Sequence, residues 1–152
     1  MKVLYTFVCI VFCSSGSAQS DTADQVQKTV DTFFEAFHKG DTVLLKSVLH
    51  KDAIFQTIYK NKAGEDILRH DDVAKVIQAI GNKPEGQKWT EKLLDYSIQI
   101  DSNMANAWTP YEFYLNDEFS HCGVNSFQMI NDAGQWKVIY LVDTRRRAGC
   151  RE

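Results

Sequence analysis

The stretch WTPYEFYLNDEFSHCGVNSFQMINDAGQWKVIYLVDTRRR, residues 108–147, decides the fold of this chain. It contains three apolar, aromatic-rich runs, which are separated by Asn116-Asp117 and by Asn131-Asp132-Ala133-Gly134. Apolar runs bounded by Asn, Asp and Gly clusters are typical of consecutive antiparallel strands joined by hairpins. The last third of the chain therefore predicts an antiparallel sheet.

The predicted sheet begins before this stretch. Leu94, Tyr96, Ile98 and Ile100 alternate with polar residues, which is the period-two pattern of a strand with one wet face. Together with strands at 104–115, 119–130 and 136–145, this segment predicts a four-stranded meander.

The N-terminal half favours helices. Apolar residues recur at spacings of three and four over 24–38, and a shorter helix is expected to start at Asp41. A strand over 53–59 and a short returning strand over 66–70 lead to a third helix, capped by Asp71 or Asp72. Helices first and a long meander last predict an α+β fold whose helices cover one face of the sheet.

Residues 1–18 have the pattern of a secretory signal peptide. Lys2 supplies a positive charge, residues 3–13 are apolar, and small residues precede Gln19. The apolar run is too short to span a bilayer, so we expect no membrane attachment after cleavage. This interpretation predicts a single domain over 19–152 that is secreted or periplasmic.

The composition argues against a nucleic-acid partner. The 152 residues carry a formal net charge of −3, so there is no basic excess to bind a phosphate backbone. Two of the four cysteines, Cys122 and Cys150, lie outside the signal segment. In an oxidising compartment they either pair or remain as two free thiols. A metal site using His121 and Cys122 is disfavoured because adjacent strand residues point to opposite faces, and no metal or cofactor is expected.

The chain resembles the nuclear transport factor 2-like superfamily over residues 24–147. The resemblance is carried by VQKTVDTFFEAFHKGDTVLLKSVLHKDAIF at 26–55, with its FxxAFxxGD motif, by the helix after the first hairpin, and by GQWKVIYL at 134–141. It points to a branch of small bacterial proteins with lumazine-binding-like and polyketide-cyclase-like members. The resemblance implies a cone-shaped domain: three N-terminal helices close over a curved antiparallel sheet and leave a pocket between them. Members include isomerases, dehydratases, hydrolases and pure binding modules, so the fold does not define the chemistry.

The last hairpin nominates a site. A three-residue loop that pairs Asn131 with Gln135 would place one set of side chains on a single surface. That set has an apolar end with Phe127, then Asn125, and a polar end with His121, Asp143 and Arg145. A two-residue loop would instead move Asp143 to the face opposite His121.

These residues suggest roles within a pocket. His121 would act as a general base, Asp143 would orient it and raise its basicity, and Arg145 would stabilise negative charge. The walls are expected to include Tyr59, Tyr96, Trp108 and Tyr111. The structural alternatives are a hydrogen-bonded histidine, an Asp143–Arg145 ion pair of little energetic weight, and aromatic residues that belong to the core.

Three hypotheses follow from the sequence. The first is an exported domain that binds a small, partly apolar molecule. The second is a metal-free enzyme for dehydration, isomerisation or hydrolysis that uses the His121–Asp143 pair. The third is an interaction module that forms a homodimer through the outer sheet face, where Tyr114 is expected.

Overall fold

The computed structural model describes residues 16–150, with side chains from Thr22 onward. The segment 1–15, which holds most of the predicted signal peptide, lies outside the described residues. The signal peptide therefore stays a prediction. Within the described part of the chain, no helix is long and apolar enough to cross a membrane.

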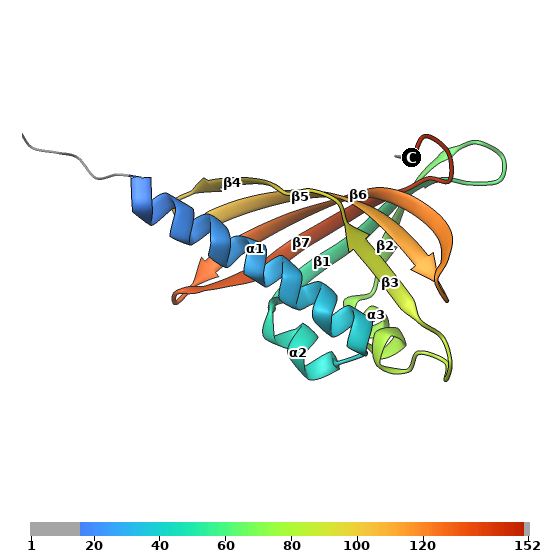
Figure 1. Cartoon of the computed structure of the whole chain (residues 1–152), viewed down its shortest axis with the longest axis horizontal. Coiled ribbons are helices and arrows are strands. Elements are labelled where there is room, and N and C mark those ends of the chain that lie inside the picture. The colour runs from blue at the N-terminus through green and yellow to red at the C-terminus, as the bar shows by residue number, and fades with distance from the viewer. Residues whose placement is uncertain (1–15, 151–152) are drawn as a thin grey trace, which may run out of the picture.

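Three helices occupy the N-terminal half, as the sequence predicts (Figure 1). Asp41 caps the second helix by accepting hydrogen bonds from the backbone N–H groups of Val43 and Leu44, at 3.0 and 2.9 Å. Asp72, rather than Asp71, caps the third helix in the same way. The helices are α1 (Gly16–Lys39), α2 (Thr42–Ser47) and α3 (Val73–Gly81).

A single seven-stranded sheet forms the rest of the domain. Its order is β2-β1-β7-β6-β5-β3, and β4 pairs with β5 beside this path. All pairs are antiparallel except β1 with β7, which the sequence did not predict. The strands are β1 (Leu49–Lys60), β2 (Asp66–Asp71), β3 (Trp89–Leu93), β4 (Ser97–Asp101), β5 (Met104–Leu115), β6 (Glu118–Asp132) and β7 (Gln135–Arg145).

The predicted first strand of the meander is wrong in detail. Of the alternating segment from Leu94 to Ile100, residues 94–96 lie outside any strand and only residues 97–100 belong to a strand, β4, while β3 ends just before the segment at Leu93. Two short strands therefore pair with successive parts of the long strand β5. This break allows β3 to run at the far edge of the sheet.

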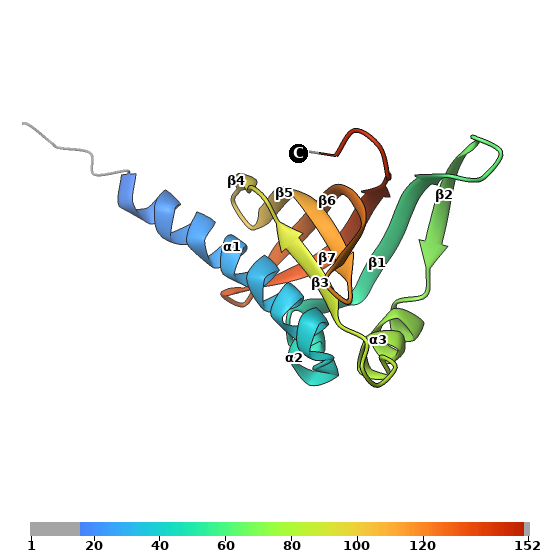
Figure 2. The ribbon, with the colours of Figure 1, turned by 45° about the vertical axis from the view of Figure 1, so that its right-hand side comes forward.

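The α1 helix packs across the concave face of the sheet (Figure 1). Its buried face carries Val26, Val30, Phe33 and Phe34, and the rings of Phe33 and Phe34 lie 5.4 and 5.9 Å from the ring of Phe127 on β6. The edge strands β2 and β3 are joined in the sequence by α3, so this helix closes the space between the two ends of the bent sheet (Figure 2). The apolar stripe of the helices and the inner sheet face thus form one core.

The predicted register of the last hairpin is wrong. Asp132 pairs with Gln135 across a two-residue turn, in which Ala133 and Gly134 both have positive φ. Farther along, Ile139 has no partner on β6, and this bulge shifts the register by one more residue in the same direction.

The turn and the bulge together move β7 by two residues relative to the prediction. Because the side-chain period of a strand is two, residues beyond the bulge that were predicted to point inward, such as Leu141 and Asp143, stay inward. Asn125 therefore faces Asp143, and Phe127 faces Leu141, both on the concave face. Before the bulge the shift is only one residue, so Trp136 and Val138 are the residues that point into the core.

The Cys122–Cys150 pair is a disulfide, which confirms one of the two alternatives. Cys122 lies on the convex face of β6, and the bond holds the C-terminal tail against that face. The backbone groups of Cys122 and Arg146 also exchange two hydrogen bonds of 2.9 Å. One covalent bond and two backbone hydrogen bonds thus hold the tail after β7 against β6.

Candidate functional site

A pocket of about 140 Å³ lies between the helices and the concave face of the sheet. Its apolar wall comes from α1, α3 and two central strands, through Phe33, Phe34, Phe37, Phe55, Val76, Ile80 and Leu141. Its polar wall comes from five strands, through Gln56, Thr57, Arg69, Asp71, Glu91, Asn125, Asp143 and Arg145. An apolar chamber with one polar side is the common form of a small-molecule site.

The sheet register explains why the polar side chains meet. One cross-strand row runs from Arg69 on β2 through Thr57 on β1 and Asp143 on β7 to Asn125 on β6. Residues in one such row point to the same face and lie about 5 Å apart. Four strands therefore each bring one polar group to the same level of the pocket.

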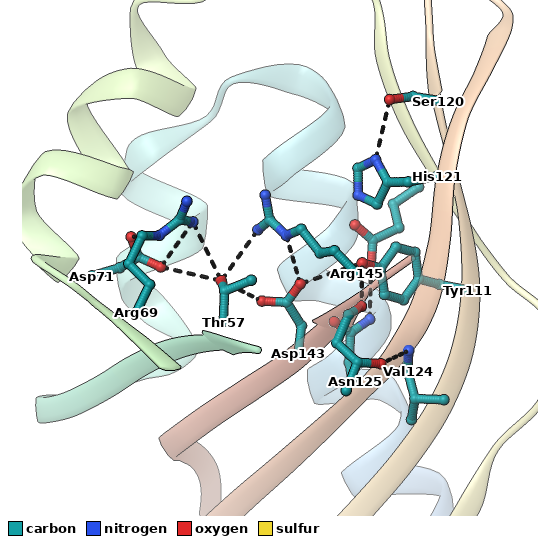
Figure 3. A network of polar contacts seen from close by, with 12 residues as sticks. Thr57, Arg69, Asp71, Tyr111, Ser120, His121, Val124, Asn125, Asp143 and Arg145 are labelled. Carbon is teal, nitrogen blue, oxygen red and sulfur yellow. Dashed lines mark hydrogen bonds and ion pairs between the residues drawn. The ribbon is translucent and has the colours of Figure 1, made fainter. Parts of the chain in front are cut away.

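Thr57 is the centre of this row (Figure 3). Its hydroxyl donates to Asp143 Oδ1 at 2.7 Å and lies 3.3 Å from Arg69 Nη2 and 3.5 Å from Arg145 Nη2. Each guanidinium also pairs with a carboxylate on its own strand: Arg145 Nε donates to Asp143 Oδ2 at 2.7 Å, and Arg69 Nε donates to Asp71 Oδ1 at 2.8 Å. The two pairs are balanced in charge.

Glu91 is the acidic residue that the sequence reasoning missed. It lies on β3, and its Oε1 accepts a hydrogen bond of 2.7 Å from Asn125 Nδ2. Burial raises the pKa of Glu91 to about 8; the charge of Asp143 adds to this rise, while the Asn125 hydrogen bond and Arg145 oppose it. At neutral pH this carboxyl group is therefore mostly protonated.

A sequence signal for Glu91 was present. Trp89, Glu91 and Leu93 share one parity on a short strand, so an acidic residue stands between two apolar residues that pack against the core. A carboxylate on the buried face of a strand is uncommon and often marks a functional site.

Tyr111 supports the polar wall from behind. It is fully buried, and its hydroxyl donates to the carbonyl oxygen of Thr144 at 2.9 Å and lies 3.3 Å from Asp143 Oδ2. Burial, together with the negative charges of Asp143 and Glu91, raises the pKa of the Tyr111 phenol above its usual value. Its side chain positions Asp143 and does not itself line the cavity.

His121 is not among the residues that line the pocket. Its ring is 4.9 Å from the ring of Phe113 and 5.8 Å from that of Tyr111, and its Nδ1 is 3.1 Å from Ser120 Oγ (Figure 3). Burial and the charge of Arg145 lower the pKa of His121 to about 4, although Asp143 acts in the opposite direction. Asp143 thus raises the basicity of this imidazole, as expected, but burial and Arg145 outweigh it, so the pKa of His121 is lower than usual. A catalytic role of His121 remains a prediction.

The four other predicted pocket residues are not among the side chains that line the cavity. Phe127 is buried in the core beneath it. Tyr59 lies beside Arg69, whose guanidinium carbon is 5.9 Å from the centre of the tyrosine ring. Tyr96 donates a hydrogen bond to Asp31 and lines an outer groove between α1 and β3. Trp108 is 48% exposed, because even-numbered residues of β5 point to the convex face.

Asn125, Asp143 and Arg145 are thus the three predicted site residues that the structure brings together around the cavity. Among the side chains that the structure describes, from Thr22 to Cys150, no three His, Cys, Asp or Glu residues are placed to hold a metal ion. Proton donors and acceptors are the chemical groups that this arrangement presents to a ligand.

Comparison with solved structures shows the same fold. A nuclear transport factor 2-like protein from Cytophaga hutchinsonii is 19% identical, with a TM-score of 0.64 over 82% of this chain and 98% of that chain. A protein from Streptomyces avermitilis, described as a "putative dehydratase" of the nuclear transport factor 2-like family, is 12% identical, with a TM-score of 0.65 over 86% and 99%. A nuclear transport factor 2-like protein of unknown function from Shewanella baltica is 13% identical, with a TM-score of 0.60 over 89% and 100%.

The sequence comparisons agree with the structural ones. No curated protein matches the chain significantly. The family model described as "Putative lumazine-binding" matches residues 21–142, which is well over half of the chain. The chain therefore belongs to this lumazine-binding-like family, within the nuclear transport factor 2-like superfamily.

Proposed function

We propose that this protein binds a small, partly apolar molecule in the pocket between its helices and the concave face of its sheet. The observation that carries the proposal is the division of the pocket into an apolar wall and a polar wall to which five strands contribute. Its volume of about 140 Å³ lies well below the 300 Å³ or more of sites for drug-sized ligands. A molecule of about one ring fits this space.

Filling the pocket tests the proposal. Leu141 lines the cavity, whereas Val142, its neighbour on β7, points to the convex face. We expect native mass spectrometry of the protein purified from its own host to show a bound small molecule. The Leu141→Trp variant should lose this molecule, and the matched Val142→Trp variant should retain it. Wild-type protein without any bound mass, or equal retention by both variants, would contradict the proposal.

Proton-transfer catalysis in the same pocket is the second candidate. It is favoured by two carboxyl groups in unlike surroundings: Asp143 pairs with a guanidinium, and Glu91 has none. Two neighbouring acids in unlike surroundings can have different protonation states. One can then act as a proton donor while the other carries a charge. A fold neighbour described as a "putative dehydratase" adds to this case. In the predicted mechanism, His121→Ala abolishes turnover of the retained molecule and leaves the melting temperature near that of the wild type.

We also propose that the protein is exported to an oxidising compartment, whichever of these two functions it has. A disulfide is typical of secreted and periplasmic proteins, and it agrees with the predicted signal peptide. N-terminal sequencing of the mature protein from its host should give Gln19 as the first residue. A mature chain that begins at Met1 would contradict export.

A homodimer through the convex face is the third candidate. Ile54, Ile58, Leu68 and Trp108 on this face are each between 41% and 52% exposed. Exposed apolar side chains on one sheet face favour association with a second copy. We expect Ile54→Lys to lower the molar mass measured by light scattering, while Val43→Lys on α2, where Val43 is 79% exposed, leaves it unchanged. A monomeric wild type would exclude the dimer.

A further inference from the structure

Glu91 lies between two spaces in the molecule. It lines the inner pocket, and it also lines a groove between α1 and β3 together with His38 and Tyr96. The backbone N–H of Glu91 donates to His38 Nε2 at 2.9 Å, which holds this part of β3 against α1. The groove gives the carboxyl group a route for proton exchange with solvent, while its hydrogen bond with Asn125 links it to a residue that lines the inner pocket.

The hydrogen bond from Asn125 locates the proton of Glu91. The amide nitrogen of Asn125 is a donor, so Oε1 of Glu91 is the accepting, carbonyl-type oxygen. The proton of the neutral acid is therefore on Oε2, which has no hydrogen-bond partner among the side chains described, from Thr22 onward. Because Glu91 lines the inner pocket, this O–H group is available as a hydrogen-bond donor to a ligand there.

The charges around Glu91 explain why it is protonated. From inside the pocket, Asp143, Arg145 and Tyr111 influence it, and Arg69 and Asp71 line the same cavity. In the groove the charged and titratable groups are Asp31, Glu35, His38, Lys39 and Tyr96. No cation within the described residues forms an ion pair with Glu91, because Arg69 and Arg145 pair with Asp71 and Asp143.

We propose that Glu91 is the specificity-determining residue of the pocket and donates its proton in a hydrogen bond to the carbonyl oxygen of an uncharged ligand. This inference rests on the proposed binding function. A carboxylate ligand of the same shape is rejected, because it would meet two carboxylates while both guanidinium groups are already engaged. Deprotonation of Glu91 removes the donor and places a negative charge opposite the ligand oxygen.

Benzamide and benzoate provide the test, since they have nearly the same shape but differ in charge. Glu91 is followed by NMR of protein labelled with ¹³C at the glutamate carboxyl carbons, and Glu91→Gln identifies its signal. We expect a midpoint near pH 8 without a probe. Saturating benzamide should raise this midpoint, by about one pH unit for a tenfold preference for the protonated form. Benzoate should bind at least about tenfold more weakly, and Glu91→Gln should make benzamide binding independent of pH between 6.5 and 8.5.

The outcomes separate this inference from the proposed function. A Glu91 midpoint near 4.5, or equal affinity for the two probes, would overturn the role of Glu91 and leave pocket binding intact. Failure of both probes to perturb any signal of the pocket residues would overturn the binding function itself. Binding of benzamide with an upward shift of the Glu91 midpoint supports both.

Discussion

Replacing Glu91 with Gln should change how the stability of the protein depends on pH. Glutamine has nearly the shape of glutamic acid, and its carbonyl oxygen can still accept the hydrogen bond from Asn125. The substitution thus removes the titration of Glu91 and preserves its contacts. The variant isolates one group in a pocket that contains several charges.

The sign and size of the effect follow from the shifted pKa. Glu91 releases its proton near pH 4.5 in the unfolded chain and near pH 8 in the folded protein. Between these values the folded state binds one more proton, so the free energy of unfolding falls as pH rises. The slope is about 1.4 kcal/mol per pH unit, and the whole window amounts to roughly 3–5 kcal/mol.

His121 acts in the opposite direction over part of this range. Its pKa is about 4 in the folded protein and 6.5 in the unfolded chain, so its contribution to stability is lost as pH falls from 6.5 to 4. The lowered pKa of His38 has the same sign, and its window also lies below pH 6.5. Above pH 6.5, the loss of stability due to Glu91 is no longer offset by either histidine.

Urea unfolding followed by tryptophan fluorescence between pH 6.5 and 8.5 measures this prediction. The wild type should lose stability up to about pH 8, and Glu91→Gln should be nearly flat and more stable at pH 8.5. Glu118→Gln, at the exposed start of β6, is the matched control and should retain the wild-type slope. Parallel profiles for the wild type and Glu91→Gln would refute the assignment of a neutral carboxyl group to the pocket.

Three further substitutions test the fold, each by its free energy of unfolding. A Cβ atom at Gly123 would lie 1.7 Å from the carbonyl oxygen of Thr144, so Gly123→Ala should cost about 3 kcal/mol or more; a loss under about 1 kcal/mol would contradict this close approach. Cys150→Ser removes the disulfide between two cysteines that are 28 residues apart in the sequence, and it should lower the free energy of unfolding by about 2–4 kcal/mol. The wild type under reducing conditions should show the same loss. Asp41→Ala removes the N-cap of α2 and should cost about 1 kcal/mol, whereas an unchanged stability would show that the cap is dispensable.

Much of the fold could be predicted because its local signals are strong. The turns of the last two hairpins are marked by Asn116-Asp117 and by Ala133-Gly134, which all have positive φ, and the N-caps at Asp41 and Asp72 are adjacent to their apolar helical patterns. The parallel pairing of β1 with β7 could not be read in this way. It joins segments about 85 residues apart, and neither strand carries a local signal for its partner.

The candidate site was predicted only in part, for a physical reason. Asn125, Asp143 and Arg145 lie on neighbouring strands, and their common face survives a register error of two residues. Glu91 comes from the opposite edge strand and reaches the same pocket only because the sheet bends. The long strand β5 carries aromatic residues on both faces, so its sequence does not show which alternate residues point inward. Trp108 was therefore assigned to the wrong face.

The charge balance of the pocket follows from a spacing of two residues on a strand. Asp143 and Arg145 on β7, and Arg69 and Asp71 on β2, are each two residues apart and therefore point to the same face. Each guanidinium thus finds its carboxylate on its own strand and needs no partner from another strand to balance its charge. Glu91 has Trp89 and Leu93 at the corresponding positions, so its strand offers no cation on the same face, and burial is the main cause of its raised pKa. A cation introduced at Leu93 would restore the pattern of the other two strands, and it would convert the neutral acid into a third ion pair.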